Sequence, residues 1–396
     1  MDSASSKDFL IGEQHDHSHS KERPMFTLSY TRTVKIMFCI LLIYLVFLLK
    51  TWLRKEDSIT SIGIQSLSSL LPFVPIQITQ PKPPVIETPK KYLSSHLAAN
   101  ARLGNHLFEL ASLYGISKKL KRIPTFFMDT HWHYDMIKDS DFLIPGLIDH
   151  FLIVNETIPK IIVPFNFSMR CCIYDNPDRL KNITDEYLHL RGAFYQSWKY
   201  FARMRNELMG YLKKPNNNFT DLPKSSQDNF ITCVHIRRTD FVGTGFHVPE
   251  KDFILSAMKF VEEKEKKRTD MNMTHVFFSD DLKYVKSLLN ETFVLKDGTK
   301  KNLKATTFIS KDTPSDSILY SSLHCDVVLF TAPHSTFGWW MGYLSKGNQV
   351  YYTDIKFVKD NSIPGGKFNP DDYYPPHWTP VKYGGPDNVT VIESLK

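Results

Sequence analysis

The sequence predicts an α/β fold in which a mostly parallel sheet carries helices on both faces, behind a single N-terminal transmembrane helix. Two observations predict it: one apolar run of nearly bilayer length lies close to the N-terminus, and further along the chain short apolar runs alternate with segments of helical periodicity. The chain has 396 residues and a formal net charge of +7. This positive net charge is compatible with a small anionic ligand. Since no basic patch is interleaved with aromatic residues, we expect no nucleic-acid partner.

The membrane segment is the first element along the chain. Apolar residues run without interruption from Ile36 to Leu49, and Lys35 and Lys50 at the two ends have side chains long enough to reach the headgroups. We interpret residues 34–53 as a transmembrane signal anchor, because a bilayer needs roughly 17–25 residues, and residues 1–33 as a cytoplasmic tail. A cleaved signal peptide fits less well because no small-residue cleavage site follows. A buried core helix is the alternative that stays open.

A stem is predicted after the anchor, at residues 54–92, because this stretch is rich in Ser, Pro, Gln and Thr. Every glycosylation sequon of the chain lies C-terminal to the anchor, which indicates a lumenal C-terminal portion. The seven sequon asparagines are Asn155, Asn166, Asn182, Asn218, Asn272, Asn290 and Asn388. Dimerisation through the stem stays open.

Four cysteines follow the anchor, and an oxidising compartment would allow them to pair. They are Cys171, Cys172, Cys233 and Cys325. Three pairings are conceivable, and we do not expect the adjacent Cys171 and Cys172 to bond to each other. The chain has no C-x-x-C pair, so a structural zinc site has little support.

Residues 93–396 are long enough for a large core or for two lobes that share a cleft, which we place at about 93–228 and 229–396. The apolar periodicity predicts secondary structure in order along this region. Helices are expected at 104–122, 198–213, 249–267, 282–289 and from about 336, and strands at 123–128, 230–236, 276–278, 324–330 and 349–352, with a further extended stretch at 151–163.

An H-x-R-R-x-D cluster stands at the end of the strand predicted at 230–236. Its members are His235, Arg237, Arg238 and Asp240. A guanidinium offers a planar fork of donors that suits a diphosphate, and the carboxyl ends of parallel strands are where open α/β sheets bind ligands. The alternative is a buried Arg–Asp ion pair that only ties a loop to the sheet.

Two more polar loops, 279–281 and 335–338, follow other predicted strands. All three loops should converge at one edge of the sheet, which outlines a nucleotide-sugar site. A metal-dependent transferase would be expected to present an Asp-x-Asp pair, but the residue two places after Asp280 is Leu282. The sequence therefore predicts no metal requirement. Asp280 and Asp281 could instead cap the helix that follows them.

Four motifs in a fixed order resemble one family. The first is Gly-Asn-x-x-Phe-x-x-Ala at 104–111, the second is the run 190–201, the third is the H-x-R-R-x-D cluster, and the fourth is Thr-Phe-Gly-Trp-Trp at 336–340. In these motifs the chain resembles the α1,2-fucosyltransferases of glycosyltransferase family eleven, most closely the divergent invertebrate members. The resemblance covers nearly the whole region after the stem.

The resemblance implies a two-lobed, GT-B-like glycosyltransferase whose Rossmann-type C-terminal lobe binds the donor GDP-fucose. It implies an inverting, metal-independent transfer, with O2 of a terminal galactose on a glycoprotein or glycolipid as the acceptor. A signal anchor and a stem then imply a single-pass type II protein of the Golgi membrane.

The resemblance also implies roles for single residues. Arg237 would contact the β-phosphate and stabilise the charge that develops there, while Arg238 would brace the donor site. The remaining donor residues would be His235 and Asp326 near the guanine, Ser335 and Thr336 at the diphosphate, and Asn105 at the phosphate or the acceptor. From the residues alone, Asn105 could simply cap its helix, and Trp339 and Trp340 fit a core role better than a sugar platform.

The general base is left open between Asp240, which we favour, and His247 or Glu250. The leaving phosphate could also take the proton itself. A rival activity is that of the core α1,6-fucosyltransferases, which resemble the stretch 239–244. They carry a Lys directly after the Asp and a Glu soon after Gly-Thr, where this chain has Phe241 and Gly245. A rival of another class is a membrane-bound glycan-binding protein that has lost activity.

Overall fold

The computed structural model describes residues 89–215, 219, 221–384 and 389–395. Within these ranges no helix combines the length and the apolar character that crossing a bilayer requires. The predicted tail, the signal anchor at 34–53 and nearly all of the predicted stem lie outside the described residues, as do Asn218 and Asn388. The other five sequon asparagines are exposed.

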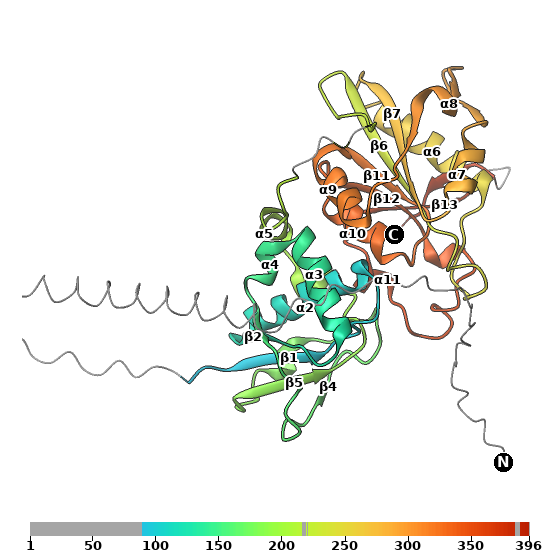
Figure 1. Ribbon diagram of the computed structural model, residues 1–396. Helices are drawn as coiled ribbons and strands as arrows, with labels where there is room; N and C mark the ends of the chain where they lie inside the picture. Colours follow the sequence, from blue (N-terminus) through green and yellow to red (C-terminus); the bar gives the residue numbers. More distant parts are fainter. Residues whose placement is uncertain (1–88, 216–218, 220, 385–388, 396) are drawn as a thin grey trace, which may run out of the picture. The chain divides into compact units, whose positions relative to one another are not determined.

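The first of two large sheets has five parallel strands in the order β3-β2-β1-β5-β4. It appears in blue to green in Figure 1. Its strands are β1 (Tyr92–His96), β2 (Ile123–Phe127), β3 (Leu152–Val154), β4 (Phe165–Asn166) and β5 (Tyr187–Arg191). The helices of this part are α2 (Leu103–Leu120), α3 (His131–Leu143), α4 (Pro145–Ile148) and α5 (Arg205–Gly210), with 3-10 turns at Pro177–Leu180 and Trp198–Phe201.

The second sheet begins at Asn229 and has seven strands in the order β10-β7-β6-β11-β12-β13-β14, all parallel except the last pair. Its strands are β6 (Asn229–Ile236), β7 (Asn272–Ser279), β10 (Thr307–Ile309), β11 (Val327–Phe330), β12 (Gln349–Thr353), β13 (Thr379–Tyr383) and β14 (Val391–Glu393). A separate hairpin pairs β8 (Thr292–Val294) with β9 (Lys300–Asn302).

Helices cover both faces of the second sheet, as expected from the β–α alternation. Alternate residues of β6 point to opposite faces: Val234 packs in one core cluster with α6, while Cys233 packs in the other with α9 and α10. The helices of this part are α6 (Lys251–Glu265), α7 (Leu282–Leu288), α8 (Leu303–Thr306), α9 (Pro314–His324), α10 (Thr336–Tyr343) and α11 (Pro370–Tyr373), with a 3-10 turn at Ile355–Phe357. The prediction of an α/β fold with mostly parallel sheets is confirmed.

Several predicted elements differ in extent from the observed ones. The helix predicted at 198–213 is a 3-10 turn and the short α5, because Arg203 between them has a positive φ of 67° that interrupts a right-handed helix. Only Leu152–Val154 of the extended stretch 151–163 is a strand, and the strand predicted from His324 begins at Val327 because His324 ends α9. The prediction omitted the strands β1, β4, β5, β8, β9, β10, β13 and β14.

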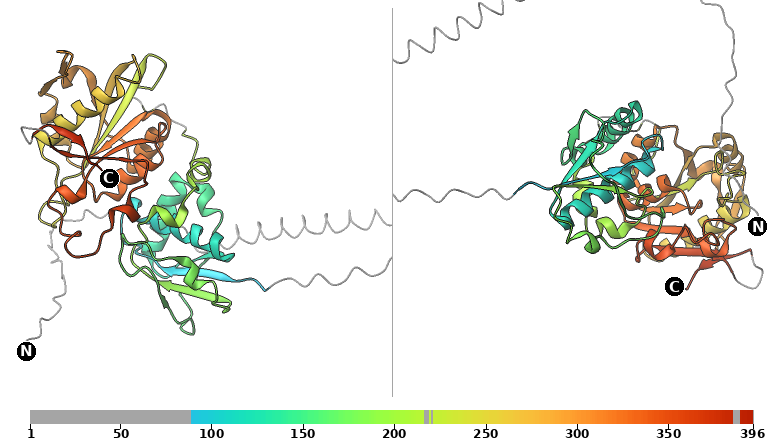
Figure 2. Two further views of the ribbon diagram at one scale, coloured as in Figure 1. Left: turned by 180° about the vertical axis from the view of Figure 1, so that it is seen from behind. Right: turned by 90° about the horizontal axis from the view of Figure 1, so that it is seen from below.

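An aromatic cluster joins α2 to α10, and the expectation that Trp339 and Trp340 are core residues is confirmed. Their exposures are 0% and 1%, and the Nε1 of Trp340 donates to the Gly104 carbonyl at 3.0 Å. Phe108 of α2 packs against both indoles, with ring centroids 4.5 and 5.2 Å away. The contact between α2 and α10 brings the blue-green part of the chain against the orange part in Figure 2.

The disulfides correct one prediction. Cys233 of β6 bonds to Cys325, which lies at the start of the neighbouring strand with a Cα–Cα distance of 5.6 Å. Cys171 then bonds to the adjacent Cys172, so the expectation that these two do not pair is wrong. The reason is topological: strand pairing of β6 with β11 brings Cys233 and Cys325 together, which leaves the other two only each other.

The buried Glu109 of α2 makes stability depend on pH. Burial raises the pKa of its carboxyl to about 8, and hydrogen bonds from the Ala98 N–H at 3.1 and 3.2 Å oppose this only in part. Because the unfolded chain loses this proton near pH 4.3, the folded state holds more protons between there and pH 8, and the free energy of unfolding falls as pH rises.

We expect Glu109→Gln, which stays neutral, to raise the free energy of unfolding at pH 8 by on the order of 1–3 kcal/mol more than at pH 4. Urea unfolding at the two pH values measures this difference. The exposed Glu156→Gln is the control and should show none. An equal effect of Glu109→Gln on the free energy of unfolding at both pH values would contradict the raised pKa of Glu109.

Candidate functional site

A cavity of about 1050 Å³ opens where the carboxyl ends of β6, β7, β10 and β11 meet the N-terminal ends of α2 and α10. Arg237, Asp280 and Thr336 all line it, so the structure brings together the three polar loops that the sequence placed at strand ends. Residues of the first sheet's part, including Asn105 and Gln196, complete the wall. The site therefore collects residues from both halves of the described chain.

Arg237 presents a fixed guanidinium to this cavity. Its Nε and Nη2 donate to the two carboxylate oxygens of Asp240 at 2.9 and 2.6 Å, and the ring of Phe241 lies 5.2 Å from the guanidinium carbon. The Arg237 side chain is 14% exposed, and Arg102 approaches the same carboxylate at 3.2 Å. Because Asp240 occupies one edge of the fork, the Nη1 edge is left to face an anionic ligand. Both residues of this ion pair line the cavity.

The side chain of Arg238 makes its contacts outside the cavity. Its Nη1 donates to the Pro249 carbonyl at 2.6 Å, and its guanidinium stacks on the Tyr284 ring at 3.7 Å. Asp280 accepts hydrogen bonds from the backbone N–H groups of Arg238 and Thr239 at 2.9 and 3.2 Å. Arg238 is outside the set of cavity-lining residues. It braces the loop that carries Arg237, and a direct donor contact of Arg238 has no support from this geometry.

His235 and Ser335 form a buried pair beneath the cavity. The His235 Nε2 lies 2.8 Å from the Ser335 hydroxyl, which also accepts from the Gly338 N–H and so caps α10. Burial, together with the nearby charge of Arg237, lowers the pKa of His235 to about 3, so this imidazole stays neutral. A Cβ on Gly338 would lie 2.3 Å from the His235 ring. The absence of a side chain at position 338 therefore lets α10 begin directly over this histidine.

The N-termini of two helices meet at Gly104 and Thr336. A Cβ on Gly104 would lie 2.6 Å from the Thr336 hydroxyl oxygen and 2.7 Å from the Phe337 nitrogen, so only glycine allows α2 and α10 to approach this closely. Each helix presents unpaired backbone N–H groups and a partial positive charge at this end. Together with Arg237 they make this side of the cavity suitable for a polyanion.

Asn105 lines the cavity and is not the cap of its helix. The N-cap of α2 is Arg102, which makes no side-chain cap hydrogen bond. The side-chain Oδ1 of Asn105 instead accepts a hydrogen bond from the side-chain Nε2 of Gln196 at 2.9 Å, and Gln196 is 4% exposed. This contact holds the Asn105 side chain toward the cavity. The capping alternative is therefore excluded.

Asp326 is a second predicted donor residue, besides Arg238, that does not line the cavity. It precedes β11, at the opposite end of that strand from Ser335, and is not a cavity residue. Its carboxylate accepts from the Ile231 N–H at 2.9 Å and from Lys346 at 2.8 Å. These contacts fix the amino end of the strand. The predicted guanine contact through Asp326 has no geometric support.

The three candidate general bases differ in their position relative to the cavity. Asp240 lines the cavity, but the hydrogen bonds from Arg237 lower the pKa of its carboxyl and make it a weak proton acceptor. His247 is not a cavity residue, and burial lowers its pKa to about 4. Glu250 precedes α6, also away from the cavity. None of the three combines position with basicity.

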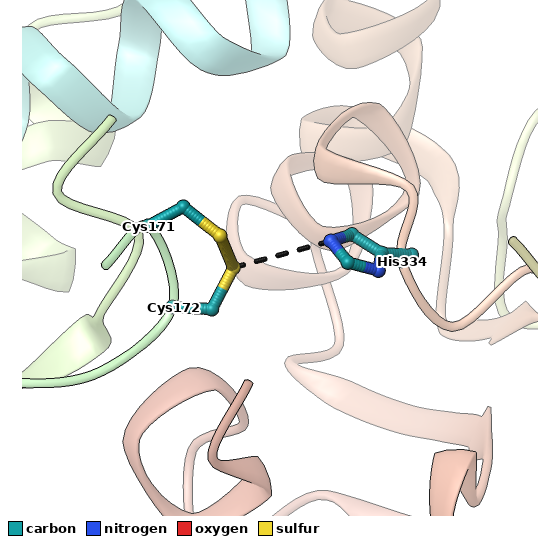
Figure 3. Close-up of side chains that lie close together, drawn as sticks. All are labelled: Cys171, Cys172 and His334. Carbon is teal, nitrogen blue, oxygen red and sulfur yellow. Dashed lines mark hydrogen bonds between the residues drawn. A yellow bond between two sulfur atoms is a disulfide. The ribbon is translucent and has the colours of Figure 1, made fainter. Parts of the chain in front are cut away.

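Two features bear on metal binding. Asp281 accepts from the Tyr284 N–H at 2.9 Å and so caps α7, as one of the alternatives held. Among the described residues, Cys171, Cys172 and His334 offer ligand atoms within 4.8 Å of one another (Figure 3). The two sulfurs are bonded to each other, so in this form they offer no thiolate to a metal ion.

The cavity residues that the sequence analysis did not single out include Arg102, Gln196, Asp312 and His334. Gln196 lies inside the motif at 190–201, where its position gave a signal that was not used. His334 directly precedes Ser335, and Asp312 directly precedes Thr313, the cap of α9. Burial raises the pKa of the Asp312 carboxyl. Only their spatial convergence identifies these residues as part of the site.

Comparisons with known proteins agree with the motifs. The model of the family "Glycosyl transferase family 11" matches residues 70–382. The Caenorhabditis elegans protein named "Putative galactoside 2-alpha-L-fucosyltransferase svh-11" is 44% identical over 318 residues, 79% of this chain and 86% of that protein. A Caenorhabditis elegans "Galactoside 2-alpha-L-fucosyltransferase" is 32% identical over 308 residues, covering 71% and 74%. A crystal structure of "NodZ alpha-1,6-fucosyltransferase soaked with GDP-fucose" has a TM-score of 0.39 at 11% identity and covers 69% of this chain and 100% of that one.

Proposed function

This chain belongs to glycosyl transferase family 11 and is a fucosyltransferase, and from that premise we propose that it moves L-fucose from GDP-fucose to O2 of a terminal galactose. The observation that supports the donor best is Arg237, whose guanidinium faces the cavity between the N-termini of α2 and α10. The proposal includes the GT-B-like arrangement in which the second sheet's part, 229–396, binds the donor.

The donor diphosphate would lie against Arg237 and the hydroxyl of Thr336, with Asn105 on the opposite wall. Two helix N-termini and a cation here balance the charge of the two phosphates. Ser335 would act indirectly, because its hydroxyl caps α10 and contacts His235. His235 would hold this serine as a neutral imidazole.

Guanine would need a carboxylate that can accept from its N1 and N2 donors. Asp312 fits this role better than Asp326, because it lines the cavity. Of the other cavity carboxylates, Asp280 accepts from the backbone of the arginine loop, Asp240 accepts from Arg237, and Asp139 belongs to α3 in the part of the chain that carries the first sheet. We therefore assign the base contact to Asp312.

In the transfer, a lone pair of the acceptor hydroxyl attacks the anomeric carbon while the bond from this carbon to the β-phosphate oxygen breaks. GDP leaves with the electron pair, the hydroxyl loses its proton, and attack from the face opposite to the phosphate inverts the anomeric configuration. The Nη1 edge of Arg237 would stabilise the negative charge that builds on the β-phosphate. This cation can serve in place of a metal ion, so the proposal requires none.

The proposed α1,2 linkage to galactose follows the names of the relatives. The core α1,6 alternative is disfavoured because Phe241 and Gly245 stand where that family carries Lys and Glu. Phe241 stacks on Arg237, and Gly245 has a positive φ of 87° that disfavours a glutamate there. Under this proposal the chain is a single-pass type II protein of the Golgi membrane, with its stem, its sequons and the transferase domain in the lumen.

A transfer assay with purified full-length chain tests the proposal. We expect product from GDP-fucose on terminal β-galactosides in the presence of EDTA, and little product on core-type N-glycans or from other nucleotide sugars. Product on the core GlcNAc would favour the α1,6 alternative. Binding of GDP and glycans without any product would favour the inactive glycan-binding protein.

A further inference from the structure

We propose that His334, supported by Ser362 and Asp360, is the general base that removes the proton from the acceptor hydroxyl. This inference rests on the proposed fucosyl transfer. It assigns the role that Asp240, His247 and Glu250 do not fill. His334 stands on the loop between β11 and α10, directly before Ser335, and lines the same cavity as Arg237.

The position of His334 relative to Arg237 suits an inverting transfer. Arg237 stacks on Phe241 at 5.2 Å, the ring of Phe241 lies 5.0 Å from that of Phe246, and Phe246 lies 4.3 Å from His334. Two aromatic rings thus separate the base from the cation along one wall. In-line displacement needs such a separation, because the sugar ring stands between the leaving phosphate and the attacking hydroxyl.

The Nδ1 side of the ring faces a buried carboxylate. His334 Nδ1 lies 3.3 Å from the Ser362 hydroxyl and 3.7 Å from Asp360 Oδ1, and Ser362 donates its hydroxyl proton to Asp360. The Asp360 side chain is 0% exposed. Among the described residues, His334 is the sole basic side chain at ion-pair distance from it. An imidazolium formed at His334 would therefore be stabilised by this anion, as in other His–Asp pairs.

The charge of Asp360 is well supported. Burial alone would raise its pKa, but hydrogen bonds from His334, the Ser362 hydroxyl and the Ser362 N–H outweigh this and lower the pKa to about 2. The His247 N–H also donates to Asp360 at 3.2 Å. Asp360 thus remains an anion throughout the pH range of an assay.

The Nε2 side of the ring faces the disulfide. Figure 3 shows Nε2 of His334 directed at the Cys171–Cys172 bond, with the Cys172 sulfur 4.0 Å away. A disulfide sulfur carries no proton to donate, so the Nε2 lone pair remains available to an acceptor hydroxyl. Phe368, with its centroid 5.1 Å from the imidazole, helps Phe246 hold the ring in this orientation.

The other titratable group that faces His334 is Tyr373, with ring centroids 6.4 Å apart. Burial raises the pKa of its phenol, so Tyr373 stays neutral, and the disulfide does not titrate. Among the described residues, Asp360 is the carboxylate at ion-pair distance from His334. The proton balance is simple: the acceptor hydroxyl transfers its proton to Nε2 as the oxygen bonds to the anomeric carbon, and GDP departs as the anion.

The test compares His334→Asn with the wild type in the galactoside transfer assay. Asparagine keeps an amide near the Nδ1 position but lacks Nε2. We expect kcat to fall by about 10²–10⁴-fold while GDP still raises the thermal midpoint. His334→Gln serves as a second variant if Asn reduces folding, and the exposed His131→Gln is the control that should keep full activity.

The pH dependence of kcat/KM separates a base from a structural role. The kcat/KM of the wild type should rise with pH on its acidic limb, because only a neutral imidazole accepts a proton. Asp360→Asn removes the anion that stabilises the imidazolium, so this limb should move to lower pH; Ser362→Ala is the substitute if that variant does not fold. An unchanged pH profile in His334→Asn, or activity within threefold of the wild type, would overturn the inference. If the wild-type chain transfers no fucose, this result would refute the proposed function instead.

Discussion

Arg237→Ala should lower kcat/KM for transfer from GDP-fucose by about 10²–10³-fold, because it removes the cation that stabilises the leaving diphosphate. The fold should survive the change. Asp240 keeps its ion pair with Arg102 at 3.2 Å, and the loop remains braced by Arg238 through Pro249 and Tyr284. Steady-state kinetics measures the loss, and a thermal melt of the same sample shows whether folding is intact.

The exposed Arg268, which follows the C-terminal end of α6, provides the matched control: Arg268→Ala should leave kcat/KM unchanged. Arg237→Lys should recover only part of the activity, because an ammonium cannot satisfy both Asp240 oxygens and a phosphate with one planar fork. Turnover of Arg237→Ala within threefold of the wild type would show that the diphosphate is bound elsewhere.

Trp340→Ala should lower the free energy of unfolding by about 3–5 kcal/mol, because it empties a fully buried site. The indole is 1% exposed, packs against Phe108 and Phe201, and donates to the Gly104 carbonyl. For a domain of this size the thermal midpoint should fall by roughly 10 °C. Differential scanning calorimetry of the two chains measures the shift.

Trp340→Ala should also disturb the active site, because the hydrogen bond from Trp340 to the Gly104 carbonyl holds the start of α2 against α10. Trp132→Ala is the control, because this indole is 48% exposed and its truncation leaves no internal cavity. A fall of less than 2 °C in the midpoint of Trp340→Ala would contradict the view that this cluster joins the two halves of the chain.

The residues that sequence predicted well are those whose role follows from position along one strand. The arginine loop comes directly after β6 and the Ser335–Thr336 turn comes after β11, and in a parallel sheet both must emerge at the same edge. The fold class followed for the same reason, because β–α alternation leaves few arrangements. Trp339 and Trp340 could be placed in the core because they open a helix that must pack against the sheet.

The residues that sequence missed depend on contacts between distant segments. Gln196 acts by holding Asn105, 91 positions away, and His334 acquires its partners from residues 360 and 362. The predicted guanine contact of Asp326 lacks support for a different reason. Asp326 adjoins β11, whose carboxyl end does reach the cavity, but it lies at the amino end, so the length of the strand separates it from the cavity. Pairing of Cys171 with Cys172 became evident only once β6 and β11 had brought the other two cysteines together.

The measurement that tests the central claim most directly is a crystal structure of this chain with GDP. The account predicts the β-phosphate within hydrogen-bond distance of Arg237 and close to the N-termini of α2 and α10, with Asp312 on the guanine edge. GDP bound at the opposite end of the second sheet, beside Asp326 and Lys346, would contradict it.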